Sequence, residues 1–440
     1  MKKKFYIETM GCQMNKSDTE RLEGMFIELG YQKTESHKDA DFLIVSTCAI
    51  RQTSVDKAYS QLGVWGKRKK NQPNIKIGIC GCAAEIDKDT LFKKMPYLDL
   101  IFGTHNIFKF PEFVKRVEHG EKVCEITTIP YPEPEELKLN RQNTVGAWIP
   151  IIEGCNNFCT YCVVPFTRGR ERSRLPELII REAKQAIQSG KKEITLLGQN
   201  VDSYGKDLHN PEITLANLLR KLNQIDGKFR IRFVTSYPTD ITDDLIEAVA
   251  ECDKVCEFFH IPMQSGNSRV LKAMNRRYDR EQYYQIFNKI RNRFEEVEIT
   301  SDFIAGFPGE TEEEFLDTLS AIEELKIDYS NTAIYSPRPF TKAGKMTDLF
   351  IPEEIKEERF KRLHEVNCKM TLESNKKLVG KIYEVLCESQ KEKKGQLMMN
   401  ARTRTGKLVH FQSDKDLTGH FVNVKITKAQ TWCLYAELVV

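Results

Sequence analysis

The stretch EGCNNFCTYC, from Glu153 to Cys162, contains three cysteines spaced C-x3-C-x2-C: Cys155, Cys159 and Cys162. A structural zinc site needs four protein ligands, so three thiolates leave it incomplete. Closely spaced thiolates are typical ligands of iron–sulfur clusters, and three of them on a cluster of four irons leave one iron open to a chelating small molecule. The pattern therefore favours an under-liganded iron–sulfur cluster, with structural cysteines or a zinc site as the alternatives.

The stretch begins at the end of the first of six apolar segments that have the length of strands. These segments are 147–153, 193–199, 230–236, 256–263, 298–306 and 329–336. Helical patterns lie among them, at 176–188, 240–252 and 311–325. Alternating strands and helices predict a parallel sheet, and six such units over residues 144–375 predict an open, partial (β/α)6 barrel. Its active site is expected at the carboxyl ends of the strands, where the three cysteines lie.

Residues 1–127 show the same alternation, which predicts a parallel α/β domain with strands at 4–9, 41–47, 75–80 and 98–103. Cys12, Cys48 and Cys82 each come just after the end of a different strand. Because the carboxyl ends of parallel strands line one edge of a sheet, these three cysteines are expected to converge there. They predict a second cluster with three thiolate ligands. Cys80, two residues before Cys82, is the alternative third ligand.

A different kind of domain is expected after the barrel, and a Pro-rich, acidic linker before it, over residues 128–143. Residues 376–440 contain short alternating strands, such as FVNVKIT (421–427), which predict a small antiparallel β-barrel. This tail has 12 Lys and Arg against 6 Asp and Glu, a surplus of +6, whereas the whole chain has a net charge of +4. A compact basic barrel is suited to binding nucleic acid; the alternative is a solvated surface with a chance surplus.

Length and composition set the wider limits. At 440 residues the chain is expected to form two or three domains. Thirteen cysteines, an odd number in a chain of this size, are better explained by metal ligands or buried apolar residues than by a disulfide framework. No apolar run approaches the length of a membrane helix, about eighteen residues, and Glu8 interrupts the N-terminal candidate for a leader. The sequence predicts a cytoplasmic protein with no membrane contact.

The C-x3-C-x2-C motif after the first strand of a partial barrel resembles that of the radical S-adenosylmethionine (SAM) enzymes. With the N-terminal cysteines and a tail that resembles a TRAM domain, the whole chain resembles the methylthiotransferases. The shared stretches are GCQMN (11–15), GCNNFCTYCVVPFTRGRERSR (154–174), LLGQNVDSYG (196–205), HIPMQSGNSRVLKAMNRRY (260–278) and GFPGETEEEF (306–315). The last of these also predicts a capping box at a helix start, with Thr311 as N-cap and Glu314 three residues later.

The resemblance implies an activity, cofactors and partners. SAM would bind the open iron of one [4Fe-4S] cluster, and a 5′-deoxyadenosyl radical would abstract hydrogen from carbon 2 of an isopentenylated adenosine next to the tRNA anticodon. A second [4Fe-4S] cluster would supply the sulfur, and a second SAM the methyl group. The expected partners are tRNA and an electron donor protein such as flavodoxin or ferredoxin, and the protein is expected to be a monomer. Such a radical needs a cavity closed to water.

The resemblance also indicates further site residues. Contacts with SAM are expected from Tyr161, Gln199, Asn200, Gln264, Ser265 and Asp302. Contacts with RNA are expected from arginines after the cluster loop and in the tail: Arg168, Arg170, Arg402 and Arg404. For the arginines after the cluster loop, the carboxylate of SAM is the other expected partner. Ordinary hydrogen bonds at loop starts and surface salt bridges are the alternatives for these two groups. No catalytic side chain is predicted beyond the cluster cysteines.

Two other functions are compatible with parts of the pattern. One is methylthiolation of threonylcarbamoyl-adenosine in tRNA or of a ribosomal-protein aspartate, but Gln13 and Met14 in GCQMN favour isopentenylated adenosine. The other is a non-catalytic iron–sulfur protein that binds RNA through its tail. Sites with three cysteines favour the enzyme, because a structural cluster has no reason to leave an iron open.

Overall fold

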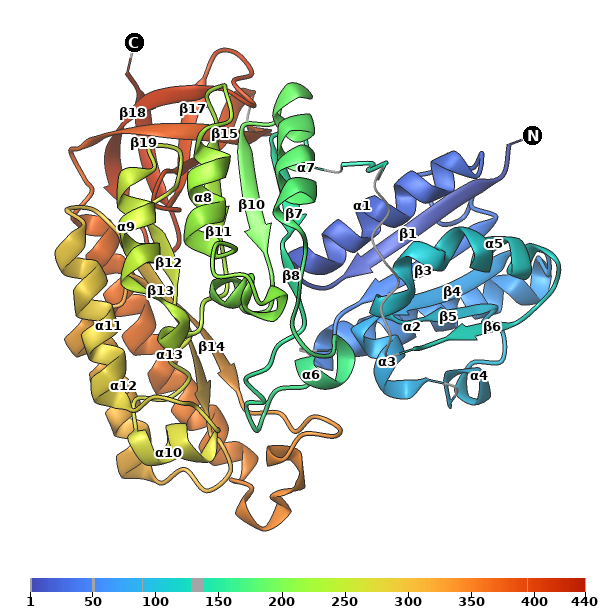
Figure 1. The fold of residues 1–440 in the computed structure, drawn as a ribbon, viewed down its shortest axis with the longest axis horizontal. Helices are drawn as coiled ribbons and strands as arrows, with labels where there is room; N and C mark the ends of the chain where they lie inside the picture. Colours follow the sequence, from blue (N-terminus) through green and yellow to red (C-terminus); the bar gives the residue numbers. More distant parts are fainter. Residues whose placement is uncertain are drawn as a thin grey trace.

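The chain folds into three parts that follow one another in sequence (Figure 1). The computed structural model describes residues 2–49, 52–88, 90–127, 138–141, 143–393 and 395–439. An α/β domain comes first, a partial barrel of strands and helices second, and a closed five-stranded barrel last. The α/β class and the architecture predicted from the sequence are confirmed. Most of the linker expected over 128–143 lies outside the described residues.

The first domain is built on a six-stranded parallel sheet with the order β2-β1-β3-β4-β5-β6. Its strands are β1 (Lys4–Met10), β2 (Gln32–Lys33), β3 (Phe42–Thr47), β4 (Lys76–Gly81), β5 (Leu100–Phe102) and β6 (Val123–Glu125). Its helices are α1 (Gln13–Glu28), α2 (Gln52–Asn71), α3 (Cys82–Asp87), α4 (Thr90–Lys94) and α5 (Phe110–Glu118). One apolar core lies under α1 and α5 and a second under α2, so helices cover both faces of the sheet. The four expected strands are present, and the short β2 and β6 extend the sheet at its edges.

The second part is an incomplete parallel barrel. Its strands are β7 (Gly146–Pro150), β10 (Glu193–Leu197), β11 (Arg230–Phe233), β12 (Phe258–His260), β13 (Glu298–Ala305) and β14 (Tyr329–Ile334). They form two three-stranded parallel sheets, and an isolated bridge between Ile231 of β11 and Val255, just before β12, joins the two. No ladder joins β7 to β14 among the described residues, so the barrel is open along that side, as the six predicted units imply.

Helices surround the barrel, and one of them forms hydrogen bonds with the backbone of its edge strand. They are α6 (Val164–Thr167), α7 (Pro176–Gln188), α8 (Leu215–Asn223), α9 (Asp243–Glu251), α10 (Ser268–Ala273), α11 (Arg280–Arg293), α12 (Glu312–Leu325) and α13 (Glu353–Lys376). On α13, the Asn367 amide accepts a hydrogen bond from the Ser330 N–H (2.9 Å) and donates one to the Ser330 carbonyl (2.8 Å). This amide satisfies backbone groups that the edge strand β14 would otherwise leave unpaired. None of the helices in the described residues is long and apolar enough to cross a membrane.

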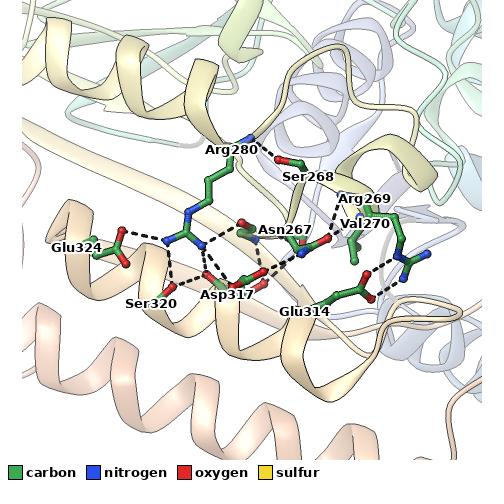
Figure 2. A network of polar contacts seen from close by, with 12 residues as sticks. Asn267, Ser268, Arg269, Val270, Arg280, Glu314, Asp317, Ser320 and Glu324 are labelled. Carbon is green, nitrogen blue, oxygen red and sulfur yellow. Dashed lines mark hydrogen bonds and ion pairs between the residues drawn. The ribbon is translucent and has the colours of Figure 1, made fainter.

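The shared stretch GFPGETEEEF begins α12 and has a structural role. Thr311 caps the helix and Glu314 completes the predicted capping box. Figure 2 shows that Glu314 also pairs with Arg269 of α10. In the same view, Arg280 of α11 donates to the Glu324 carboxylate (3.0 Å) and to the Asp317 carbonyl (2.9 Å), both on α12. These contacts fix three helices of the barrel to one another.

The third part is the tail, a closed barrel with the order β15-β16-β17-β19-β18. Its strands are β15 (Ile382–Lys393), β16 (Gln396–Thr403), β17 (Leu408–Ser413), β18 (Phe421–Ala429) and β19 (Leu434–Leu438). Neighbouring strands are antiparallel except β17 and β19, which are parallel. At the amino end of β11, Arg230 donates to the Arg402 carbonyl (2.9 Å) and Arg232 to the Thr403 carbonyl (2.8 Å). The tail therefore covers the barrel end opposite the cysteines.

Candidate active site

Cys12, Cys48 and Cys82 lie at the carboxyl ends of three neighbouring strands. The register sets the last residues of β1, β3 and β4 side by side. Cys12 is the N-cap of α1, Cys48 follows β3, and Cys82 begins α3. The neighbouring Cys48, and then the charge of Arg168, lower the pKa of Cys12 to about 6 against the effect of burial. The structure thus brings the three cysteines to one edge of the sheet, as the sequence predicted.

Two glycines let these cysteines approach one another. Gly81 has a φ of +91°, and a Cβ there would lie 2.5 Å from the Thr47 carbonyl oxygen. A Cβ on Gly11 would lie 3.0 Å from the Cβ of Cys48 and 2.4 Å from Asn15 Oδ1. Any larger residue at either position would displace a strand end and the cysteine that follows it.

Cys80 and Cys82 have different surroundings. Cys80 lies in the apolar core beneath α1, where burial raises the pKa of its thiol. Cys82 packs against Ala49 and Val163, and Val163 directly follows the last cysteine of the barrel loop. Burial raises the pKa of Cys82, and the nearby charge of Arg168 opposes that effect. Cys82, rather than Cys80, therefore faces the barrel.

Cys155, Cys159 and Cys162 lie in the loop between β8 (Ile152–Glu153) and α6. The Gly154 N–H at the start of the loop donates to Gln199 Oε1 (2.7 Å). Burial raises the pKa of Cys155 to about 11 and, together with Cys159, that of Cys162 to about 12. A bound metal centre stabilises thiolates and would remove these protons, so binding here is expected to release them.

Arg276 is a neighbour of this loop that the sequence analysis did not identify. It donates to Cys159 Sγ (3.4 Å) and to the Pro262 carbonyl (2.6 Å). Its guanidinium carbon lies 4.3 Å from the ring centre of Tyr237 and 4.9 Å from that of Tyr278. These contacts hold a positive charge beside a thiol. Arg276 belongs to the shared stretch 260–278, but its reach across to Cys159 depends on tertiary structure alone.

The two cysteine sites face each other across α3 and α6, which lie close together in Figure 1. Cys82, the first residue of α3, packs against Val163 just before α6. Nearby, the Thr104 hydroxyl donates to the Thr167 carbonyl (3.0 Å), and His105 Nε2 lies 2.9 Å from the Arg168 carbonyl oxygen. The first domain therefore docks directly onto the loop that carries the barrel cysteines.

Three of the four arginines after the cluster loop form ion pairs within the protein, and the pair made by Arg168 joins the two domains. The ion pairs are Arg168 with Asp18, Arg172 with Glu153 and Arg174 with Glu182, each at 2.8 Å. Arg168 is only 3% exposed, which leaves it out of reach of an RNA phosphate. Arg170 is exposed, with its guanidinium carbon 4.4 Å from the ring centre of Phe158. Of the two expected RNA contacts in this run, only Arg170 lies on the surface.

Arg402 and Arg404 make contacts within the protein. Arg402 pairs with Glu388 of the tail (2.9 Å), and Arg404 pairs with Glu257, just before β12 (2.7 Å). Their side chains remain 35% and 34% exposed. The pair with Glu257 favours a structural role over the expected phosphate contact for Arg404, where the tail meets the barrel, whereas a phosphate contact stays a prediction for Arg402.

We expect Arg404→Gln to loosen the tail without changing the salt dependence of RNA binding. The substitution removes a partly exposed ion pair with Glu257, a contact worth roughly 1 kcal/mol. Limited proteolysis between barrel and tail should then be about fivefold faster. The slope of RNA affinity against salt counts phosphate contacts and should stay unchanged. Lys425→Gln, on an exposed position of β18, is the control for proteolysis. A shallower slope for Arg404→Gln would show that this arginine contacts phosphate.

A cavity of about 770 Å³ lies beside β13 and β14 and reaches the cluster loop. Its lining includes Cys162 and three of the residues expected to contact SAM: Tyr161, Gln264 and Asp302. Arg338 also lines it and donates to Gln52 of the first domain (2.7 Å). The cavity therefore adjoins the barrel cysteines and extends to the interface between the two domains.

The other three residues expected to contact SAM are engaged elsewhere. Gln199 accepts the Gly154 N–H, Asn200 donates to Asp240 (2.6 Å), and Ser265 lies 3.3 Å from the Thr318 hydroxyl. None of the three is among the residues that line the cavity. These contacts correspond to the hydrogen bonds at loop starts that were the alternative interpretation.

The described side chains suit iron–sulfur clusters better than single metal ions. No group of three or more His, Cys, Asp or Glu side chains in the described part of the chain is placed to hold one ion. Zn–S bonds of about 2.3 Å would require a tight group, whereas a four-iron cluster holds its thiolates farther apart at its corners. Two buried donors near the N-terminal cysteines, Asn15 Nδ2 and Arg168 Nη1, find no hydrogen-bond partner among the residues that the structure describes, which suits an anionic group with acceptor atoms.

Comparison with known proteins defines the class. Residues 149–322 match the Radical SAM superfamily, residues 4–103 match the uncharacterized protein family UPF0004, and residues 376–439 match the TRAM domain. The fold and the cysteine motif therefore define a radical SAM enzyme with an added α/β domain and a TRAM tail.

The chain belongs to the family of tRNA-2-methylthio-N(6)-dimethylallyladenosine synthases. It is 48% identical over 441 residues to the synthase of that name from Clostridium perfringens (strain SM101 / Type A), covering 100% of this chain and 98% of the relative. The synthase from Clostridium beijerinckii is 47% identical, with 99% and 96% covered. The radical SAM methyltransferase TsrM from Kitasatospora setae, solved with tryptophan and a SAM analogue, shares the fold at 12% identity, with a TM-score of 0.58 and 78% and 75% covered.

Proposed function

We propose that this protein is a methylthiotransferase that inserts sulfur and then a methyl group at carbon 2 of isopentenylated adenosine next to the tRNA anticodon. The observation that supports it best is the pair of three-cysteine sites, contributed by two domains and facing each other across α3 and α6. One such site is sufficient for radical chemistry. A second site beside it has a use if the reaction also needs a source of sulfur.

The proposal includes two [4Fe-4S] clusters and SAM. Cys155, Cys159 and Cys162 hold one cluster in residues 144–375, and Cys12, Cys48 and Cys82 hold the other in residues 1–127. When bound, these groups supply a radical for an unreactive C–H bond, the sulfur and the methyl group. Of the protein's own residues, Arg276 keeps a positive charge beside Cys159. Tyr161, Gln264 and Asp302 orient SAM in the cavity that they line.

The proposal also covers the macromolecular partners. The basic tail, residues 376–440, binds tRNA, and the exposed Arg170 contacts the RNA close to the reacting base. A flavodoxin or ferredoxin supplies electrons, and the protein acts as a monomer in the cytoplasm, where its RNA substrate is found.

Mass spectrometry of nucleosides from treated tRNA tests this function. The reconstituted enzyme with SAM and a reductant should convert isopentenylated adenosine to its 2-methylthio form, with about eight irons per chain. The matched control is the same tRNA lacking only the isopentenyl group, which should react at least about tenfold more slowly, because the pocket loses apolar contact. Modification of threonylcarbamoyl-adenosine or of a ribosomal-protein aspartate would replace the proposal with one of its relatives. RNA binding with about four irons and no SAM cleavage would indicate a non-catalytic protein.

A further inference from the structure

Arg168 belongs to the barrel but its guanidinium lies among the N-terminal cysteines. It follows α6, is 3% exposed, and donates through Nη2 to Asp18 of α1 (2.8 Å). Its Nη1 has no hydrogen-bond partner among the described residues. The guanidinium lies within hydrogen-bonding reach of the Cys82 thiol, and its charge also acts on Cys12, so it lies close to both thiols. A fixed, buried cation from one domain thus faces two of the three cysteines of the other.

Asn15 supplies a second buried donor at the same place. It is fully buried on the first turn of α1, and its Oδ1 accepts a hydrogen bond from the Cys12 thiol (3.3 Å). Its Nδ2 has no partner in the described parts of the chain, and a Cβ built on Gly81, next to Cys82, would lie 3.2 Å from that nitrogen. The amide therefore lies between the strand ends that carry Cys12 and Cys82.

Two buried donors without acceptors are costly in a folded protein. An unpaired neutral donor costs about 1–3 kcal/mol, and a charged one costs more. Asp18 satisfies one side of the Arg168 guanidinium and fixes its orientation, which leaves Nη1 directed elsewhere. The acceptor that would complete both groups is anionic, because Arg168 is always charged.

We propose that Arg168 and Asn15 are positioning residues that hydrogen-bond to anionic sulfur at the N-terminal cysteine site, and thereby retain the sulfur destined for transfer. This inference rests on the proposed function, because it needs a sulfur-bearing cluster at Cys12, Cys48 and Cys82. Hydrogen bonds to an ionised acceptor contribute about 1.5–3 kcal/mol each. Because Arg168 comes from the barrel, retention of sulfur also depends on docking of the two domains.

The experiment compares variants that keep the shape of the site. Arg168→Gln removes the cation, and the double variant Asp18→Asn/Arg168→Gln also removes the carboxylate that would be left unpaired. Asn15→Asp replaces the amide donor with an acceptor of the same shape. Arg293→Gln, which breaks an exposed ion pair with Glu247 on α11, is the control. Each reconstituted full-length protein is loaded with ³⁵S-sulfide, desalted and followed over time, and the midpoint potential of the second cluster is measured by EPR titration.

We expect Arg168→Gln and the double variant to keep about eight irons but to lose labelled sulfide about tenfold faster than the parent. The midpoint potential of Arg168→Gln should become more negative, since loss of a nearby cation disfavours the added electron, and loss of the Asp18 carboxylate in the double variant should offset part of that shift. Asn15→Asp should also lose labelled sulfide faster than the parent and shift the midpoint potential to a more negative value. Parental retention of sulfide in the fully loaded double variant would overturn the inference, as would a parental midpoint potential in Arg168→Gln. A parent protein with about four irons and no retained sulfide would instead overturn the proposed function.

Discussion

Replacement of Cys48 by alanine is expected to abolish methylthiolation while SAM cleavage continues. Cys48 follows β3, the middle one of the three strands that carry the N-terminal cysteines, whereas the barrel cysteines lie in a separate loop of another domain. Loss of one thiolate leaves two, too few to hold a cluster with one open iron. The methylthio product should fall by at least about a thousandfold, a loss of roughly 4 kcal/mol or more in transition-state stabilisation. Iron should fall from about eight to about four per chain.

Two matched cysteine variants make this test specific. Cys80→Ala removes a thiol from the apolar core two residues from Cys82 and should leave iron content and product formation near the parental level. Cys159→Ala should give the opposite phenotype, with no 5′-deoxyadenosine formed at all. If Cys48→Ala also stopped SAM cleavage, the two sites would not divide the work as proposed. Full methylthiolation by this variant would remove the N-terminal site from the mechanism.

The convergence of Cys12, Cys48 and Cys82 could be predicted because it depends mainly on local patterns. Each cysteine follows a strand that an apolar run defines, and β1, β3 and β4 are neighbours in the sheet. Successive strands of parallel α/β units usually pair side by side, so their carboxyl ends share an edge. The same reasoning predicted that the C-x3-C-x2-C loop lies at the barrel mouth and that the basic tail forms a domain of its own.

The role of Arg168 could not be predicted, because it depends on how two domains dock. The sequence predicted RNA contacts for this run of arginines from the family resemblance and from their closeness to the cluster loop. The structure instead buries α1 between the sheet and the barrel, together with Asp18, Glu20 and Arg21. A helix with charged residues beside its apolar stripe is ordinarily solvated on the charged face. The sequence of α1 therefore did not indicate that this face packs against the barrel. The functions of Gln199 and Arg276 were missed for the same reason, since both act through contacts between distant segments.

The second large effect is expected from Gly154→Ala, which should empty the barrel cluster site without touching a ligand. Gly154 has a φ of +81° and directly precedes Cys155. A Cβ there would lie 2.1 Å from the Arg170 carbonyl oxygen, so a backbone segment rather than a side-chain end would have to move. The Cys155 N–H donates to the Gly169 carbonyl (3.2 Å), and that hydrogen bond would be lost with the shift. We expect a destabilisation of about 3 kcal/mol, about four irons in place of eight, and no 5′-deoxyadenosine.

Gly190→Ala is the matched control, because it separates backbone strain from the steric clash. Gly190 has a φ of +92°, but a Cβ there would meet nothing within 4 Å. This variant should therefore lose about 1–2 kcal/mol from the left-handed backbone alone and keep its iron and its SAM cleavage. Thermal unfolding, iron analysis and chromatography of 5′-deoxyadenosine compare the two proteins directly. Equal iron content in both variants would show that the cluster loop tolerates movement of the 169–170 segment. Loss of iron from Gly154→Ala alone would show that this close backbone contact sets the position of Cys155 and hence the radical-forming site.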